Sequence, residues 1–363
     1  MKLICLLLVA AATQLPLAVE SEFVIYTRES GYAAFPSIVR LPNEELLVAF
    51  RLADRRKGVT HMDPTSRNVV VRGRQNPIFF EHQSPIVIFD RLGMQDPSLT
   101  VLRDGRILAS SFHWNVKLSE MADPKACQEL DGDCPHGVVT GIYTSMSTDN
   151  GWSWSGPEKV PAPGYEPAAT SESILEARNG DWLLPAYAAA PGKKVEDSIL
   201  VRSRDGGRTW EPPVVMARDP EEKISFQEPA LLELPSRRLL CVMRTDGAKG
   251  FMYETYSDDG GKTWSPPANT GLFGHPPHLL LARDGKVRLS YGLRQSPYGI
   301  IIAESDDGVR WDSQRTFRLR QTGGNNGDIG YPSTVQLTDG SFLTVYYFND
   351  KDGVRYIGAS HYR

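Results

Sequence analysis

The sequence predicts an all-β fold, a six-bladed β-propeller of four-stranded antiparallel blades that spans residues 21–363. Three observations carry this prediction. A strand–turn–strand pattern recurs six times, an eight-residue turn motif recurs in phase with it, and a strand-like segment near the start of the chain is placed to close the ring. Regular repeats of this length are typical of radially arranged sheets.

The recurring hairpin pairs two apolar strands through a polar turn. Dipeptides such as Asp104-Gly105 and Asn179-Gly180 occupy the turns, where positive φ favours Gly, Asn and Asp. Spacings of about 50 to 75 residues between copies leave room for one four-stranded sheet per repeat. The copies begin at Pro36, Pro97, Ser173, Pro229, His278 and Pro332.

The second motif is Ser-x-Asp-x-Gly-x-x-Trp. It occurs as STDNGWSW from Ser147, SRDGGRTW from Ser203 and SDDGGKTW from Ser257, with a shortened copy, SDDGVRW, from Ser305. In such a motif Ser and Asp cap a tight turn, Gly supplies its backbone geometry and Trp packs between blades. We therefore predict a structural role for these turns, at the outside of each blade, and not a catalytic one.

Closure of the ring is predicted from the two ends of the repeat region. After Pro332 the chain has room for three strands only, ending in VRYIGASHYR, while EFVIYT at residues 22–27 precedes the first hairpin. We expect the early segment to supply the outer strand of the last blade, because this removes an open sheet edge.

The first twenty residues differ from the rest. Lys2 precedes an apolar run at residues 3–12, followed by small residues, which is typical of a signal peptide cleaved between Ala12 and Glu20. The expected location is therefore secreted or periplasmic, with no membrane span after cleavage; an uncleaved anchor is the alternative. The net charge of −4, without a basic run, argues against nucleic acid as a partner.

The cysteines predict no metal site. Cys127 and Cys134 flank a short polar loop, and in an oxidising compartment they either form a local disulfide or remain two thiols. Cys241 lies in the apolar stretch LLCVM and is expected to be a buried free thiol. No Cys/His spacing is typical of structural zinc.

Polar residues at the ends of the hairpin strands are expected to converge on the propeller axis, the usual ligand site of this architecture. Carboxylates and a tyrosine stand where inner strands begin, and arginines, tyrosines and a histidine stand where second strands end. The former are Asp96, Glu172, Glu228 and Tyr331, and the latter include Arg51, His113, Tyr187, Arg244 and Arg294.

Four segments resemble those of bacterial-type sialidases. GYPSTVQLTDG resembles the segment of the nucleophile, which implies Tyr331; FQEPALLELPSRRLLCVMR implies Glu228 as its partner and Arg244 as a carboxylate ligand. YGLRQSPYGIIIAESDDG implies Arg294 as a second such ligand, and HMDPTSRNVVVR implies Asp63 as acid/base. A neutral tyrosine avoids repulsion from a sugar with a carboxylate at its anomeric carbon, and arginines match that carboxylate.

One position departs from the resemblance. Sialidases have an arginine in a Phe/Tyr-Arg-Ile-Pro motif, whereas the matching stretch here is AAFP with Ala34 at that place. Arg51, at the other end of the same hairpin, is expected to reach the same space, and Asp96 and Glu172 are expected to contact sugar hydroxyls.

The resemblance implies a secreted exo-α-sialidase-like glycoside hydrolase that releases a terminal acidic sugar from a glycan with retention, without metal or cofactor. Two alternatives stay open. One is another glycosidase or a polysaccharide lyase on an acidic glycan, using Asp96, Glu172 and Glu228. The other is a non-catalytic carbohydrate-binding propeller.

Overall fold

The computed structural model describes residues 17–54, 62–81, 84–116, 137–321 and 323–363. Every regular element in these ranges is a β-strand. No helix that could cross a membrane occurs in this described part of the chain. The expected signal peptide lies almost wholly, and Cys127 and Cys134 entirely, outside the described residues.

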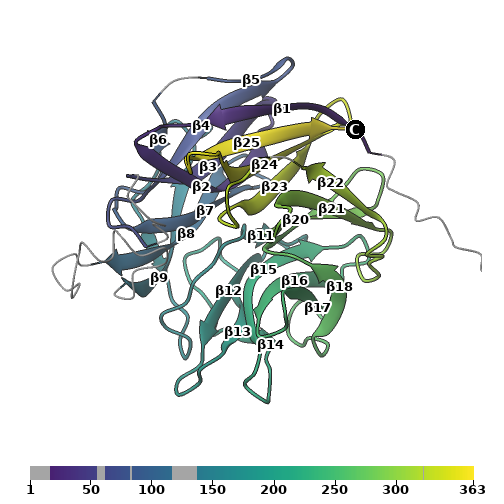
Figure 1. Ribbon diagram of the computed structural model, residues 1–363. Helices are drawn as coiled ribbons and strands as arrows, with labels where there is room; N and C mark the ends of the chain where they lie inside the picture. Colours follow the sequence, from purple (N-terminus) through teal and green to yellow (C-terminus); the bar gives the residue numbers. More distant parts are fainter. Residues whose placement is uncertain (1–16, 55–61, 82–83, 117–136, 322) are drawn as a thin grey trace, which may run out of the picture.

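The strands form sheets arranged around a common centre, as Figure 1 shows, so the predicted all-β propeller class is confirmed. Four sheets have four strands each, in the orders β10-β9-β8-β7, β11-β12-β13-β14, β15-β16-β17-β18 and β19-β20-β21-β22. Their strands are β7 (Met94–Val101), β8 (Ile107–Val116), β9 (Gly137–Ser147), β10 (Glu158–Val160), β11 (Leu175–Glu176), β12 (Trp182–Ala189), β13 (Glu196–Ser203), β14 (Val214–Ala217), β15 (Ser225–Glu233), β16 (Leu239–Asp246), β17 (Phe251–Ser257), β18 (Ala268–Phe273), β19 (Pro277–Leu281), β20 (Val287–Leu293), β21 (Gly299–Ser305) and β22 (Thr316–Arg320).

The remaining strands form one nine-stranded sheet. It consists of β1 (Val19–Tyr26), β2 (Gly31–Arg40), β3 (Glu45–Asp54), β4 (Arg67–Gln75), β5 (Ile78–Phe80), β6 (Ile86–Val87), β23 (Gly330–Gln336), β24 (Phe342–Asn349) and β25 (Arg355–Tyr362). The expectation of six separate four-stranded sheets is thus not met in that form. The reason is a single contact, because a parallel pairing of Tyr32 in β2 with Arg355 in β25 joins the first and last strands of the repeat region.

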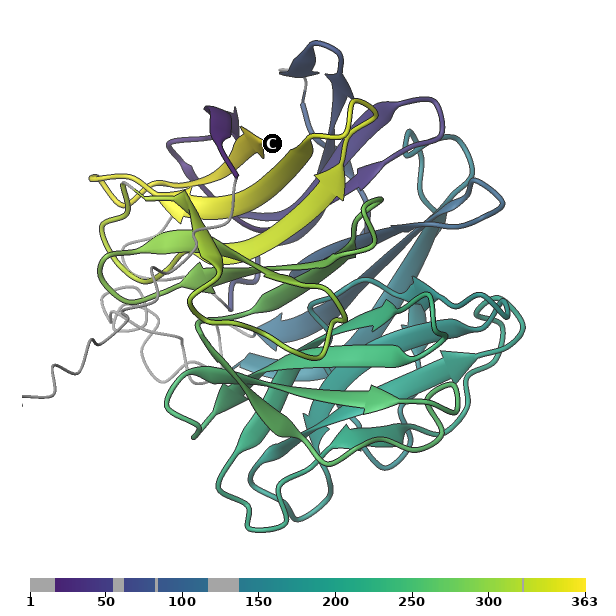
Figure 2. The same ribbon diagram turned by 90° about the vertical axis from the view of Figure 1, so that its right-hand side faces the viewer.

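All six predicted hairpins are present as antiparallel pairs: β2–β3, β7–β8, β11–β12, β15–β16, β19–β20 and β23–β24. The predicted closure is also confirmed. β1 pairs antiparallel with β25, with Val24 opposite Gly358, and Ala18 and Arg363 exchange backbone hydrogen bonds beyond it. Figure 2 shows the purple N-terminal and yellow C-terminal strands side by side.

The Ser-x-Asp turns have the structural role predicted for them. In the first copy the Ser147 hydroxyl bonds the Asp149 carboxylate at 2.8 Å and accepts from the Gly151 amide at 2.8 Å. Gly151 has φ of 83°, which favours glycine. The tryptophans of the four copies, Trp154, Trp210, Trp264 and Trp311, pack against four different core clusters. Cys241 is fully buried, as expected.

Candidate active site

Four inner strands begin with the same backbone irregularity. Phe35, Asp96, Glu228 and Tyr331 each precede a proline and have φ between 44° and 56°, a region that L-residues rarely adopt. The pairing of each strand with its neighbour shifts register at this point. Such strained bulges re-aim side chains and concentrate at functional sites. The hollow at the axis of the sheets is lined by three of these residues, Phe35, Asp96 and Tyr331, together with Glu172 and His278.

Tyr331 and Glu228 form the centre of the site. The Tyr331 hydroxyl, from β23, donates a hydrogen bond to Oε1 of Glu228 in β15, and Glu228 is 4% exposed. Nη1 of Arg244 lies 3.2 Å from both carboxylate oxygens of Glu228. The structure therefore brings Tyr331 to Glu228 and Arg244, which belong to a hairpin about 100 residues earlier in the chain, as the resemblance implies.

The charges of this centre fix its protonation. Burial, and then the Glu228 charge, raise the pKa of Tyr331 well above its usual value, so its hydroxyl is a proton donor. Burial alone would raise the pKa of Glu228, but Arg244, the Tyr331 hydroxyl, His275 and Arg294 together hold that pKa below its usual value. Glu228 is thus an ionised acceptor in contact with a neutral phenol, the arrangement of a nucleophile beside its base.

Arg294 lies next to this centre, at the end of β20. Its Nε donates to the Gly327 carbonyl at 2.7 Å, and its Nη2 lies 3.8 Å from Oδ1 of Asp328. The Arg294 side chain is 18% exposed, and the Arg244 side chain is 28% exposed. Both side chains therefore remain partly accessible to a ligand.

Arg51 and Asp63 are placed near the axis but are closed to solvent. Arg51 in β3 lies opposite Ala34 in β2 and is 0% exposed, with its guanidinium 5.2 Å from the ring centre of Tyr32. Asp63 is 1% exposed, and its Oδ1 accepts from the amide and the hydroxyl of Thr65 at 2.7 and 2.6 Å. Arg51 therefore fills the space beside Ala34 from within the fold and does not present its guanidinium to solvent.

Asp96 and Glu172 line the axis and contact residues of other sheets. Oδ2 of Asp96 accepts from the Ser171 hydroxyl at 2.7 Å. Oε2 of Glu172 lies 3.4 Å from Nδ1 of His278. Both predicted sugar ligands thus face the axial hollow. Asp96 contacts the next sheet along the chain, whereas Glu172 contacts His278 of the β19–β22 sheet, beyond the β15–β18 sheet.

Sequence reasoning missed a second carboxyl group beside Glu228. Glu196, at the start of β13, accepts a hydrogen bond from Nε2 of Gln227, and burial followed by the Glu228 charge raises its pKa. It also missed Asp328, a buried carboxylate in the loop GGNNGDIG. No motif marks either residue; the only available signal for Glu196 was its place at a strand end, as for the residues that were found.

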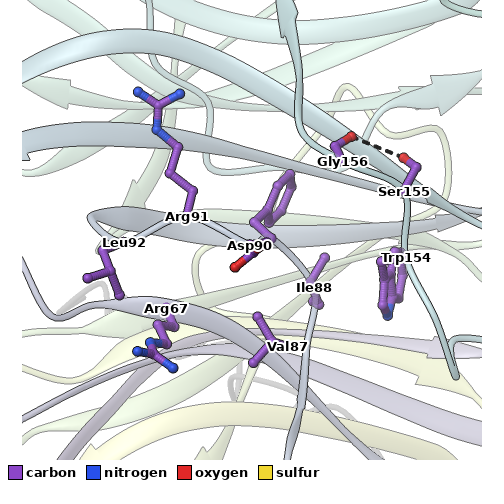
Figure 3. Close-up of a pocket in the computed structure, with 10 residues that line it drawn as sticks. Arg67, Val87, Ile88, Asp90, Arg91, Leu92, Trp154, Ser155 and Gly156 are labelled. Atoms are coloured by element: carbon purple, nitrogen blue, oxygen red, sulfur yellow. Dashed lines mark hydrogen bonds between the residues drawn. The ribbon is translucent and has the colours of Figure 1, made fainter.

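A larger hollow lies away from the axis; its empty volume, including its open mouth, is about 1060 Å³. Figure 3 shows Arg67, Arg91 and Trp154 around it, between β6, the connection to β7 and the turn after β9. None of the predicted site residues lines it. Size alone does not make it the active site, because reactive groups with perturbed pKa values converge on the axis instead.

Residues 65–344 match the family model of the BNR repeat-like domain. The chain belongs to the BNR-repeat family. This family assignment agrees with the sialidase-type resemblance of its Ser-x-Asp turns and site segments, since sialidases are among its structural neighbours. A search of curated proteins finds no relative of this BNR-repeat chain.

Solved structures of proteins that bind different ligands have the same fold. A protein of unknown function from Dyadobacter fermentans is 32% identical to this BNR-repeat chain, with a TM-score of 0.86 over 96% of this chain and 100% of that one. The intramolecular trans-sialidase of Ruminococcus gnavus, solved with oseltamivir carboxylate, is 14% identical at a TM-score of 0.67, covering 94% and 96%. An α-L-arabinanase of Penicillium chrysogenum, solved with arabinobiose, is 14% identical at 0.68, covering 95% and 98%. The fold therefore leaves the sugar undecided, and the site residues must decide it.

Proposed function

We propose that this chain is a retaining exo-glycosidase that releases a terminal sugar bearing a carboxylate at its anomeric carbon, as sialic acid does. The observation that carries the proposal is the Tyr331 hydroxyl donating to the buried carboxylate of Glu228, which Arg244 holds in turn. A carboxylate nucleophile would be repelled by such a sugar, whereas a phenol deprotonated during attack is not. The BNR-repeat fold shared with sialidases and an arabinanase supports glycosidase chemistry in general.

In the proposed reaction Tyr331 Oη attacks the anomeric carbon as its proton passes to Glu228. The glycosidic bond breaks, and the leaving oxygen takes a proton from an acid residue. Water, deprotonated by that residue, then attacks the same carbon from the opposite side; the bond from Tyr331 Oη to this carbon breaks, Glu228 returns its proton to Oη, and configuration is retained. Arg244 and Arg294 hold the substrate carboxylate through charge-assisted hydrogen bonds.

Two carboxyl groups are candidates for the acid. Asp63 is the residue that the resemblance implies, and Glu196 has the raised pKa that suits a proton donor. Asp63→Asn and Glu196→Gln distinguish them on two sialosides that differ in leaving group. Loss of the acid should slow a natural sugar leaving group far more than an activated aryl one, and the variant with that selective effect identifies the donor.

The central test is Tyr331→Phe, assayed with a fluorogenic aryl sialoside and with uronic-acid glycans and arabinan in parallel. We expect turnover of the sialoside by the wild type and a kcat at least about 100-fold lower in the variant. Tyr346→Phe is the matched control, because Tyr346 is a buried tyrosine of the neighbouring strand whose hydroxyl bonds Ser360 at 2.8 Å. Undiminished kcat in Tyr331→Phe refutes the tyrosine mechanism. Glycan binding without turnover of any substrate favours a carbohydrate-binding propeller.

We also infer that the nine-stranded sheet represents two blades, which makes six in all. Its strands fall into two antiparallel runs, β1 with β23–β25 and β2–β6, joined by the single parallel pairing of Tyr32 and Arg355. Residues 1–20 are proposed as a signal peptide of an exported protein. Mass spectrometry of the mature protein tests this through its N-terminal residue.

A further inference from the structure

Asp328 is a buried carboxylate surrounded by proton donors from distant parts of the chain. Its Oδ2 accepts from the Tyr32 hydroxyl and from Nε of Arg355, both at 2.7 Å. Its Oδ1 accepts from the Tyr347 hydroxyl at 2.9 Å and lies 3.8 Å from Nη2 of Arg294. Asp328 thus holds two guanidinium groups, one from the end of β20 and one from the start of β25.

The charges of this cluster do not balance by themselves. Burial, with the Asp328 charge next, raises the pKa of both tyrosines well above the usual value, so Tyr32 and Tyr347 donate hydrogen bonds as neutral groups. Arg294 and Arg355 remain cationic and share one carboxylate, while Arg244 is paired with Glu228. An excess of positive charge at a largely buried site favours an anionic ligand, because an uncompensated buried charge is costly.

Arg355 also lies beside the strand β2, which has Ala34 in place of the expected arginine. It pairs with Tyr32 across the β2–β25 junction, and its guanidinium lies 5.4 Å from the Tyr32 ring centre. Tyr32 and Ala34 are two residues apart in β2, so their side chains lie on the same face of the strand. The Arg355 side chain is 11% exposed, whereas Arg51 in β3, the strand on the other side of β2, is fully buried.

We propose that Arg355, held beside Arg294 by Asp328, joins Arg294 and Arg244 in binding the substrate carboxylate, so that the last strand supplies the contact that Ala34 cannot make. This inference rests on the proposed function, because it assigns the binding residue for the acid group of the same substrate. Asp328 is a positioning residue in this scheme: it orients the two arginines and does not contact the substrate.

The test uses two probes that differ only in the charge of one group: 2-deoxy-2,3-didehydro-N-acetylneuraminic acid and its methyl ester. The ratio of their inhibition constants measures how strongly the protein recognises the carboxylate. For Arg355→Met we expect the acid to lose about 10- to 100-fold in affinity, as for loss of a charge-assisted hydrogen bond, while the ester changes less than threefold. Arg355→Lys, which keeps the charge but not the planar fork, should retain part of the ratio.

A matched control separates recognition from stability. Arg202 is 9% exposed at its side chain and pairs with Asp181 at 2.6 Å in the four-stranded sheet of β11–β14, on the side that carries the Ser-x-Asp turns. Arg202→Met should lower the melting temperature without changing the ratio. Because Arg355→Met leaves Asp328 with one fewer cation, the double variant Asp328→Asn/Arg355→Met is measured alongside; since Asp328 also orients Arg294, its ratio should be at least as low as that of Arg355→Met.

The outcomes distinguish the two proposals. A wild type that prefers the acid, with an unchanged ratio in Arg355→Met and in the double variant, overturns the role of Arg355 and leaves the proposed function intact. An equal fall of the ratio in Arg202→Met also overturns it, because the effect then follows stability. A wild type that does not distinguish acid from ester refutes both.

Discussion

Glu254 is a buried carboxyl group whose ionisation should weaken the fold. It lies in β17, is 8% exposed, and accepts a hydrogen bond from Nε1 of Trp311 at 2.8 Å. Burial, despite that hydrogen bond, raises its pKa from an ordinary value of 4.5 to about 7, and the Asp307 charge adds to the rise. Trp311 belongs to the shortened Ser-x-Asp turn, so this contact links two neighbouring sheets of the propeller.

The sign of the pH dependence follows from this raised pKa. Between about pH 4.5 and pH 7 the unfolded chain loses the Glu254 proton while the folded chain keeps it, so stability falls as pH rises through this window. Each pKa unit corresponds to about 1.4 kcal/mol, so a rise from 4.5 to about 7 sets the loss at roughly 3–4 kcal/mol. Glu254→Gln removes the titration while its amide oxygen can still accept from Trp311.

We therefore expect Glu254→Gln to match the wild type in unfolding free energy near pH 4.5 and to exceed it by about 3–4 kcal/mol at pH 8. Chemical denaturation followed by fluorescence at several pH values measures the difference between the two proteins, in which other titrating groups cancel. Glu158→Gln, at an exposed position of β10, is the control and should differ from the wild type by less than about 0.5 kcal/mol at every pH. Parallel stability curves for Glu254→Gln and the wild type would refute the reasoning.

Three further predictions concern the fold. Ile25→Ala should cost about 2–5 kcal/mol of unfolding free energy, because Ile25 is 5% exposed in the closing strand, whereas Val24→Ala at a 48% exposed neighbour should change it little; equal effects in denaturation would contradict the packing of β1. Hydrogen bonds from Thr209 lower the pKa of Asp205 to about 2, so Asp205→Asn should melt below the wild type at pH 7, and the two melting temperatures should converge as pH falls from about 4 towards 2. Burial raises the pKa of the Cys241 thiol, and peptide mapping should find it alkylated by iodoacetamide only after unfolding; rapid labelling of the native protein would show that it is accessible.

The parts of the fold that the sequence could predict are those set by local chemistry. Turn dipeptides such as Asp104-Gly105 and the motif from Ser147 determine the backbone geometry of a few neighbouring residues, so hairpins and capped turns could be recognised in the sequence. The joining of the first and last strands of the repeat region into one nine-stranded sheet could not, because it depends on one long-range pairing, Tyr32 with Arg355. No periodicity records a contact of that kind.

The same division applies to the site. Tyr331, Glu228 and Arg244 stand at strand ends in recognisable segments, and the structure places them in contact. Asp328 could not be found in this way, because its loop has no strand pattern and its importance arises from partners on three other elements. The sequence does carry one further signal. Each of the four residues with positive φ near the start of an inner strand is followed directly by a proline, as Asp96 is by Pro97.

The closing strand has a consequence for how the protein is made. Glu22 in β1 and Ser360 in β25 contact each other although they are 338 residues apart in the chain. During synthesis the strand that emerges first must wait, unpaired, for the strand that emerges last, while the intervening sheets can fold in order behind the ribosome. Ring closure must therefore follow the synthesis of all the sheets between these strands, and the high sequence separation of this contact predicts that it is also a slow step. Until then both edges remain open to pairing with other chains, which makes this interval the period of greatest aggregation risk for the protein.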